Sequence, residues 1–88
     1  MQYRIELSPT RRGAARIHLP GRILELHTRR LAESEWEVSV SDPAAAKSGT
    51  IAVRAPTAHD AVWRVARAAV RAIAELTGRP LENGAGET

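Results

Sequence analysis

The sequence predicts an α+β domain: an antiparallel sheet of four to five short strands in meander order, with one long C-terminal helix packed on one face. Three observations carry this prediction. Apolar and polar residues alternate over five short segments, which is the period of a strand with one buried face. Turn residues separate several of these segments. The stretch that follows Pro56 repeats apolar residues at the period of an α-helix.

The alternation is found in residues 3–7, 15–19, 22–28, 36–40 and 51–55. Pro20-Gly21 marks a turn between the second and third segments. A tight turn there sets Ile17 opposite Leu24, an apolar pair on one face of the sheet. It also sets Arg16 opposite Glu25, an opposite-charge pair on the other face. Because Pro-Gly favours a type II turn, which splays two-residue hairpins, a longer loop or a bulge is the alternative.

The fourth and fifth segments are aligned by the same reasoning. With Val38 opposite Val53, Glu37 falls opposite Arg54 on the polar face. This alignment also brings Trp36, which we expect in the core, next to the end of the fifth strand. The connection over residues 41–49 is the longest in the chain, and we expect it to be the most mobile.

Capping residues bound the helix at both ends. Thr57 is a typical N-cap, and Asp60 three residues later forms a pair of the capping-box type with it. Gly78 is a typical residue for the C-terminal end of a helix, and Pro80 prevents its continuation. We therefore expect one compact domain over residues 1–78 and a disordered polar tail over 79–88.

The helix has an apolar face, a charged face and a flank between them. At 100° per residue, the face expected on the sheet contains Val62, Val65, Ala69, Ile73 and Leu76. The opposite face contains Asp60, Arg64, Arg67, Arg71 and Glu75. Trp63 and Val70 fall on the flank. Trp63 either packs over the edge of the sheet or contacts a partner, since Trp is enriched at interface hot spots.

Composition narrows the class of protein. The chain of 88 residues contains no Cys, which excludes disulfides and thiolate metal sites, and only three aromatic residues, so its core is aliphatic and thin. No signal peptide or apolar run of membrane-spanning length is visible, and we expect a cytoplasmic location without membrane contact. The formal net charge is +3. Residues 1–30 are strongly basic and residues 31–50 are acidic, a contrast that suits either an anionic partner or ion pairs across the sheet. The strand alignments favour the ion pairs.

A mismatch in size suggests an interaction. Five strands about 4.8 Å apart make a sheet roughly 20 Å wide, whereas one helix covers about 10 Å. Either the sheet curls around the helix, or part of its apolar face is covered by a second copy or another protein. The leading hypothesis is therefore a small non-enzymatic interaction module, self-associating or binding a protein partner through an uncovered apolar sheet face and the flank of Trp63 and Val70.

The alternative hypothesis is a nucleic-acid-binding domain. Arg64, Arg67 and Arg71 form a stripe along the helix, and Arg11 and Arg12 lie near a predicted turn, so all five are candidates for phosphate contacts. The stripe is also explained as a solvated face with i,i+4 pairs between Asp60 and Arg64 and between Arg71 and Glu75. No aromatic residue is interleaved with these arginines in the sequence, so no platform for stacked bases is indicated.

Other chemistry is not indicated. The three histidines, His18, His27 and His59, fall too far apart in the predicted fold to share a metal ion. Glu33, Glu35 and Glu37 read as a charged edge strand more readily than as a cation site. The sequence contains no nucleophile elbow, phosphate-binding glycine loop or zinc-protease motif. We therefore expect no enzyme activity, no cofactor and no small-molecule substrate.

A family resemblance adds to the expectation of a protein partner. The strand at residues 36–40, the following strand, and the helix that Thr57 opens and Ala68-Ala69 continues resemble HicB-type antitoxins, over about 40 residues. That family has a turn of the Pro-Asp-x-Pro-Gly kind, whereas Asp42-Pro43 stands here in reversed order. No DNA-binding module follows the helix. The resemblance implies that the chain binds a protein partner. We do not assign the chain to this family.

Overall fold

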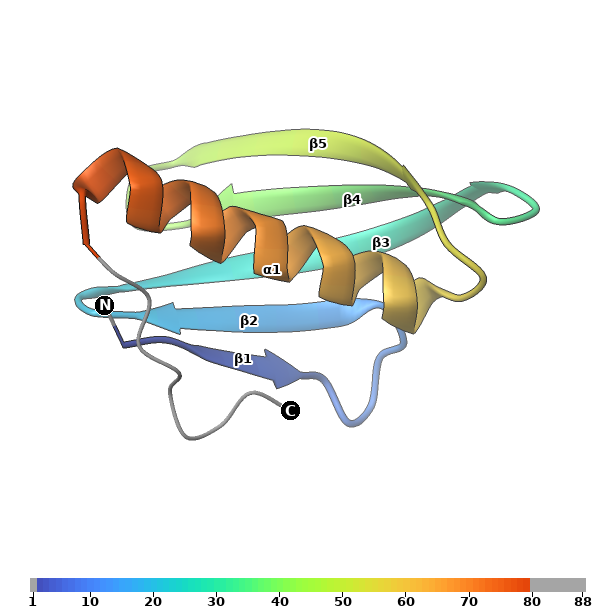
Figure 1. The fold of residues 1–88 in the computed structure, drawn as a ribbon. Helices are drawn as coiled ribbons and strands as arrows, with labels where there is room; N and C mark the ends of the chain where they lie inside the picture. Colours follow the sequence, from blue (N-terminus) through green and yellow to red (C-terminus); the bar gives the residue numbers. More distant parts are fainter. Residues whose placement is uncertain (1, 80–88) are drawn as a thin grey trace.

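A computed structural model describes residues 2–79, which form a five-stranded antiparallel sheet crossed by one helix (Figure 1). The elements are β1 (Arg4–Leu7), β2 (Ala14–Leu19), β3 (Arg22–Ala32), β4 (Glu35–Asp42), β5 (Lys47–Arg54) and α1 (Ala58–Thr77). The strands lie in the order β1-β2-β3-β4-β5, so each pairs with its neighbour in sequence. The predicted class, the meander and the C-terminal helix are confirmed. Residues 80–88 of the predicted tail lie outside the described residues.

The hairpin of β2 and β3 has the predicted register. Ile17 stands opposite Leu24 and Arg16 opposite Glu25. The connection is the two-residue turn Pro20-Gly21, in which Gly21 has φ +75°, a value that suits glycine best. The alternative of a longer loop is not needed.

The hairpin of β4 and β5 differs from the prediction. Val38 stands opposite Ile51, not Val53, so the register is shifted by two residues. Glu37 consequently lies opposite Ala52 and bonds Arg29 of β3 instead of Arg54. The predicted long connection over residues 41–49 is also wrong, because β4 continues to Asp42 and β5 begins at Lys47. A two-residue shift keeps every side chain on its face, so the alternating pattern alone could not distinguish the two registers.

The helix begins and ends where its capping residues predict. The backbone N–H of Asp60 donates to Thr57 Oγ1 at 3.1 Å, which satisfies one of the unpaired donors of the first turn. At the other end, Gly78 adopts φ +68° and its N–H donates to Glu75 O. These two contacts fix α1 directly after the last strand of the sheet.

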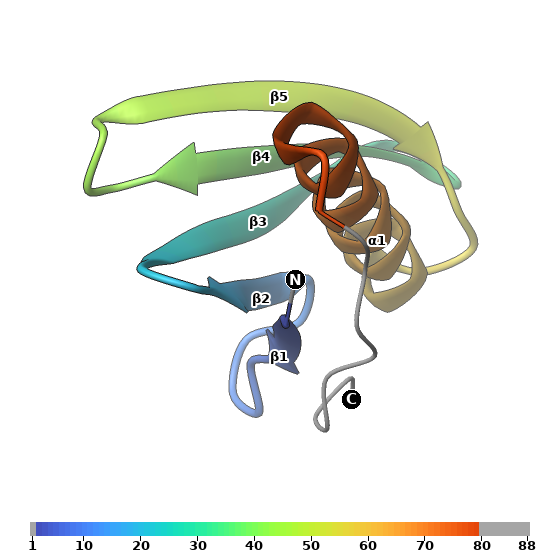
Figure 2. The same cartoon turned by 60° about the vertical axis from the view of Figure 1, so that its left-hand side comes forward.

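The buried face of the helix turns along its length. Val62, Ala66, Val70 and Ala74 are all buried, and each step of four residues advances the contact line by about 40° around the helix. Figures 1 and 2 show the cause: α1 crosses the strands diagonally, over a sheet that twists beneath it. The prediction that Leu76 lies on the sheet is therefore wrong, since its side chain is 86% exposed. Ala69 and Ile73 are partly buried against the core.

The core lies between α1 and the first four strands. Its fully buried large side chains are Ile5, Ile17, Leu26, Val38, Val62 and Val70. Trp36 packs against this cluster and donates its Nε1–H to Ala55 O at 2.8 Å, which joins the start of β4 to the end of β5. Most of β5 contributes nothing to the core, and this leaves the strand as a surface element.

Candidate interaction surface

The outer strand β5 is the least covered element of the sheet. It is eight residues long, and all its residues are exposed except Val53, which is half-buried. In Figure 2 the β4–β5 turn lies far from the C-terminal end of α1, so that the helix leaves this part of the sheet without cover. By contrast, the other outer strand, β1, has four residues and one of them, Ile5, is fully buried. The mismatch between sheet and helix is therefore concentrated at β5.

Backbone hydrogen bonds define which groups of β5 point outward. Ala55 N–H donates to Ser34 O at 3.0 Å, immediately beyond the paired ends of β4 and β5. Because bonding pairs alternate along an antiparallel ladder, residues 51 and 53 also turn their backbone groups toward β4. The N–H and C=O groups of Ser48, Thr50, Ala52 and Arg54 then point away from the sheet. We call this row of backbone groups the β5 edge.

A side chain from the helix confirms this alternation. The guanidinium of Arg64 donates to Arg54 O at 3.0 Å, so that carbonyl is directed away from β4. This contact satisfies the last carbonyl of the β5 edge and ties the strand to the second turn of α1. The preceding groups of the edge, on Ser48, Thr50 and Ala52, have no bond to another element among the described residues.

Apolar side chains adjoin the β5 edge on the face that carries the core. Ile51 stands opposite the buried Val38 yet is 48% exposed, because α1 does not reach it. Val40 and Val53 are half-buried on the same face. The uncovered apolar sheet face that the sequence suggested is thus centred on Ile51, a residue to which sequence reasoning assigned no contact. The exposure of Ile51 depends on the path of the helix, and its place beside unpaired backbone groups depends on which residues of β5 bond β4. Neither can be read from the sequence.

Trp63 and Val70 do not form the shared exposed flank that the sequence predicted. Val70 is 1% exposed and belongs to the core, so the prediction that it contacts a partner is wrong. Trp63 is half-buried against the core, and its ring stacks on His59 with centroids 6.5 Å apart and an angle of 10° between the planes. The diagonal path of α1 separates the two residues that a straight contact line places together.

The arginines of the predicted phosphate surface fall into two groups. Arg64, Arg67 and Arg71 are exposed on α1. The predicted pairs Asp60–Arg64 and Arg71–Glu75 do not form: neither is among the ion pairs of the described residues, in which nitrogen and oxygen lie within 4 Å. Arg64 bonds a backbone carbonyl instead. Arg11 and Arg12 lie in the loop between β1 and β2, near the start of the helix, and form no ion pair with another described residue.

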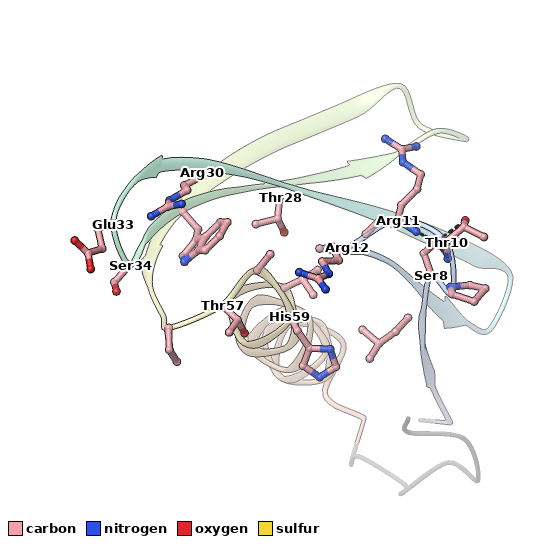
Figure 3. A pocket seen from close by; sticks show the side chains of 18 residues that line it. Ser8, Thr10, Arg11, Arg12, Thr28, Arg30, Glu33, Ser34, Thr57 and His59 are labelled. Carbon is pink, nitrogen blue, oxygen red and sulfur yellow. Dashed lines mark hydrogen bonds between the residues drawn. The ribbon is translucent and has the colours of Figure 1, made fainter.

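An open cleft of about 1040 Å³ lies where this loop meets the start of α1 (Figure 3). Arg12 points toward Thr57 and His59, whereas Arg11 extends away from the helix. On the far side of the cleft, the guanidinium of Arg30 lies 6.0 Å from the ring centroid of Trp36, a cation–π distance. An aromatic ring therefore lies beside one arginine of the cleft, a contact that the sequence pattern did not indicate, because β4 brings Trp36 beside Arg30 of β3.

Ion pairs cover much of the opposite, polar face of the sheet. Arg16 pairs with Glu25, Arg29 with Glu37 and Arg54 with Glu35, at 3.6, 3.0 and 3.4 Å. Of the two predicted pairs, Arg16–Glu25 forms and Glu37–Arg54 does not. The basic N-terminal part and the acidic middle part of the chain meet through Arg29–Glu37 and through Arg22–Asp42, at 3.1 Å. The described residues contain no group of three or more His, Asp or Glu side chains placed to hold a metal ion.

The chain was compared with protein-family models, with curated proteins and with solved structures, and none of the three comparisons gave a match. Among the residues that the structure describes, none belongs to a helix with the length and apolar character needed to span a bilayer. Proposals about function therefore rest on the geometry of the β5 edge and of the cleft.

Proposed function

We propose that this chain is a small protein-interaction module that binds by adding a strand to its sheet at the β5 edge. The bound strand is extended and antiparallel or parallel to β5, and it comes from a second copy of the chain or from another protein. Backbone groups of Thr50 and Ala52 supply the hydrogen bonds, and Ile51 supplies an apolar contact beside them. The observation that carries this proposal is the long, exposed outer strand whose backbone groups lack partners.

The composition of β5 supports the proposal. Outer strands that must not pair are kept short, interrupted by proline or bulges, or given inward-pointing charges. Over residues 48–53 the strand Lys47–Arg54 contains no charge and no proline, and its register with β4 is continuous. Its charged residues, Lys47 and Arg54, stand only at its ends. The protections expected of a strand that stays single are therefore missing from the centre of β5.

Proline at position 50 tests this function directly. The N–H of Thr50 points outward, so Thr50→Pro removes a donor of the β5 edge without removing a bond between β4 and β5. We expect wild-type chain to associate in a concentration-dependent manner in sedimentation experiments and to do so equally in high salt. Thr50→Pro should weaken this association at least tenfold, and Thr50→Ala, which keeps the N–H, should not.

Thermal unfolding of the same variants separates folding from binding. Thr50→Pro should unfold cooperatively, close to the temperature of Thr50→Ala when both are measured as monomers. If Thr50→Pro associates as strongly as wild type, the β5 edge is not the contact. A wild-type chain that stays monomeric removes self-association, and failure of extended peptides of varied sequence to bind the β5 edge would then remove strand addition as well.

The cleft favours a second candidate function, the binding of a phosphate backbone. Arg12 and the N-terminal end of α1 direct positive charge into the cleft, and Trp36 with Arg30 offers a surface for stacking. We expect Arg12→Gln to weaken binding of a single-stranded oligonucleotide and to reduce the salt dependence by about 0.7 log units per decade of salt. Fluorescence anisotropy measures both.

Arg71→Gln is the matched control for this experiment, because Arg71 is exposed on α1 and does not line the cleft. Loss of affinity in Arg12→Gln but not in Arg71→Gln supports the cleft. Equal losses place the contacts on the whole basic surface, including the stripe of Arg64, Arg67 and Arg71. No measurable binding by wild type at low salt eliminates this function.

A further inference from the structure

We infer that the strand added at the β5 edge is β5 of a second copy. The two β5 strands run antiparallel and are related by a two-fold axis midway between their Ile51 residues, which we call the axis through Ile51. This inference rests on the proposed strand addition and specifies its partner. Ile51 of one copy then faces Ile51 of the other, and the two sheets join into one continuous sheet. The partner follows from the alternation of the backbone groups, the charges at the strand ends and the position of the exposed Ile51.

The alternation of backbone groups restricts how two β5 strands can pair. An outward-pointing residue must stand opposite an outward-pointing residue of the second copy, so that both exchange hydrogen bonds. In a symmetric antiparallel pair, this requires the axis to pass through a residue and not between two residues. The register with its axis between Thr50 and Ile51 is therefore excluded. That register would also have set Lys47 opposite Arg54, a like-charge pair.

Two registers of equal length remain, with the axis through Thr50 or through Ile51. An axis through Thr50 sets Ile51 opposite Gly49 and places the ammonium of Lys47 opposite Val53. An axis through Ile51 sets the two Ile51 side chains opposite each other and Gly49 opposite Val53. The second register buries Ile51, the exposed large apolar side chain of the strand, against its own copy and keeps Lys47 away from Val53.

The spacing of the new ladder reinforces this choice. Ile51 turns its backbone groups toward β4, so it would occupy a non-hydrogen-bonded position in the ladder between copies. Opposite residues at such positions have Cα atoms about 4.5 Å apart, closer than at hydrogen-bonded positions. The neighbouring outward groups of Thr50 and Ala52 bond across the axis. At the end of this ladder Arg54 stands opposite Ser48 of the second copy, and its carbonyl, which already accepts from Arg64, has a second lone pair for the Ser48 N–H.

A two-fold pair of this kind is closed. Each copy uses β5, the only long exposed outer strand among the described residues, and the strands left at the ends of the joined sheet are the two β1 strands of four residues. The same surface patch serves both copies, as in most symmetric dimers. The inference therefore names a dimer and not a growing fibre as the product of strand addition.

Single-cysteine variants test the register, because the chain has no Cys of its own. In the proposed dimer, Ile51→Cys places two thiols opposite each other at a Cα separation within the range of disulfides. We expect oxidised glutathione to convert most Ile51→Cys chains to a covalent dimer at concentrations where wild type associates. Thr50→Cys, whose thiol faces Ala52 of the second copy, should associate like wild type but remain largely without a disulfide crosslink.

Ile23→Cys controls for random collision, since Ile23 is 46% exposed on the opposite face of the sheet. A covalent dimer of Thr50→Cys but not of Ile51→Cys places the axis at Thr50 and overturns the inference, while strand addition stands. Wild type that dimerises without a crosslink in either variant also overturns it. Wild type that stays monomeric removes the dimer altogether.

A second variant addresses loss of the isoleucine itself. Ile51→Asp sets two carboxylates against each other on the axis, so its dimer dissociation constant should rise at least tenfold at pH 7. Ile23→Asp, with equal exposure, should leave the constant unchanged. Equal effects of the two substitutions contradict an axis at Ile51.

Discussion

At the scale of single residues, Gly13 is the most closely packed of the glycines that the structure describes. It has φ +72°, and a Cβ added to it would lie 2.8 Å from Thr28 Cβ and 3.1 Å from Ala58 Cβ. The loop between β1 and β2 thus packs directly on β3 and on the first turn of α1. Glycine is required here because neither the backbone angle nor the space admits a side chain.

We predict that Gly13→Ala destabilises the fold by about 2–4 kcal/mol, the sum of a left-handed backbone and an overpacked contact. Gly21→Ala is its matched control. Gly21 has φ +75° but open space around it, so alanine should cost only about 1 kcal/mol there. Urea unfolding of both variants measures the difference. Similar losses at the two positions would show that the loop yields and that packing at Gly13 is not restrictive.

Sequence reasoning placed the neighbouring Arg11 and Arg12 near a turn and gave no packed contact for Gly13. The residues that surround it, Thr28 and Ala58, are 15 and 45 positions away in the chain, so no local pattern links them. The same limit applies to Ile51, whose exposure depends on where the helix passes. Local signals such as Pro20-Gly21 and the Thr57 cap were read correctly, because their causes lie within a few neighbouring residues.

At the scale of elements, β1 is joined to β2 by a contact that depends on pH. His18 Nε2 donates to a carboxylate oxygen of Glu6 at 3.0 Å. This hydrogen bond lowers the pKa of Glu6 below its ordinary value of 4.5, and the positive charges of Arg4 and Arg16 lower it further. A carboxyl whose pKa is lower in the folded chain stabilises the fold above its unfolded pKa, and the stabilisation is lost as the pH falls through its folded pKa.

We therefore predict that Glu6→Gln lowers the stability at pH 6 and that this loss shrinks between pH 6 and pH 2.5, as protonation of the wild-type carboxyl removes its stabilising contact. Urea midpoints at the two pH values give the comparison. Glu33→Gln is the control, because the exposed Glu33 has no ion pair with another described residue. A loss at Glu6→Gln that is the same at both pH values would indicate packing and not ionisation.

The register of β4 and β5 shows why element contacts are harder to predict than elements. Val38 has an apolar partner in both registers, Ile51 in the structure and Val53 in the prediction. Arg54 likewise has an acidic partner in both, Glu35 in the structure and Glu37 in the prediction. The choice depends on the four-residue turn that follows Asp42, in which Ala46 adopts φ +53°. A positive φ is usually predicted from glycine, and alanine rarely adopts it, so this turn could not be predicted from the sequence.

At the scale of the whole molecule, the mismatch between sheet and helix was predictable and its location was not. Strand number and helix number follow from the two periodicities, and a single helix cannot cover five strands. Helical periodicity assumes a straight contact line, which placed Trp63 and Val70 together on a flank beside the uncovered sheet face. The helix crosses a twisted sheet instead, so Val70 is buried and β5 is left exposed.

The order of the elements along the chain has a consequence for biosynthesis. During synthesis the strands emerge first and can pair one after another, because every strand neighbours its predecessor in the sheet. Among the described residues, α1 packs over the sheet face that carries Ile17, Leu26 and Val38, and it follows all five strands in the chain. The nascent sheet must therefore remain soluble with its apolar face bare until the ribosome has released the final helical turns.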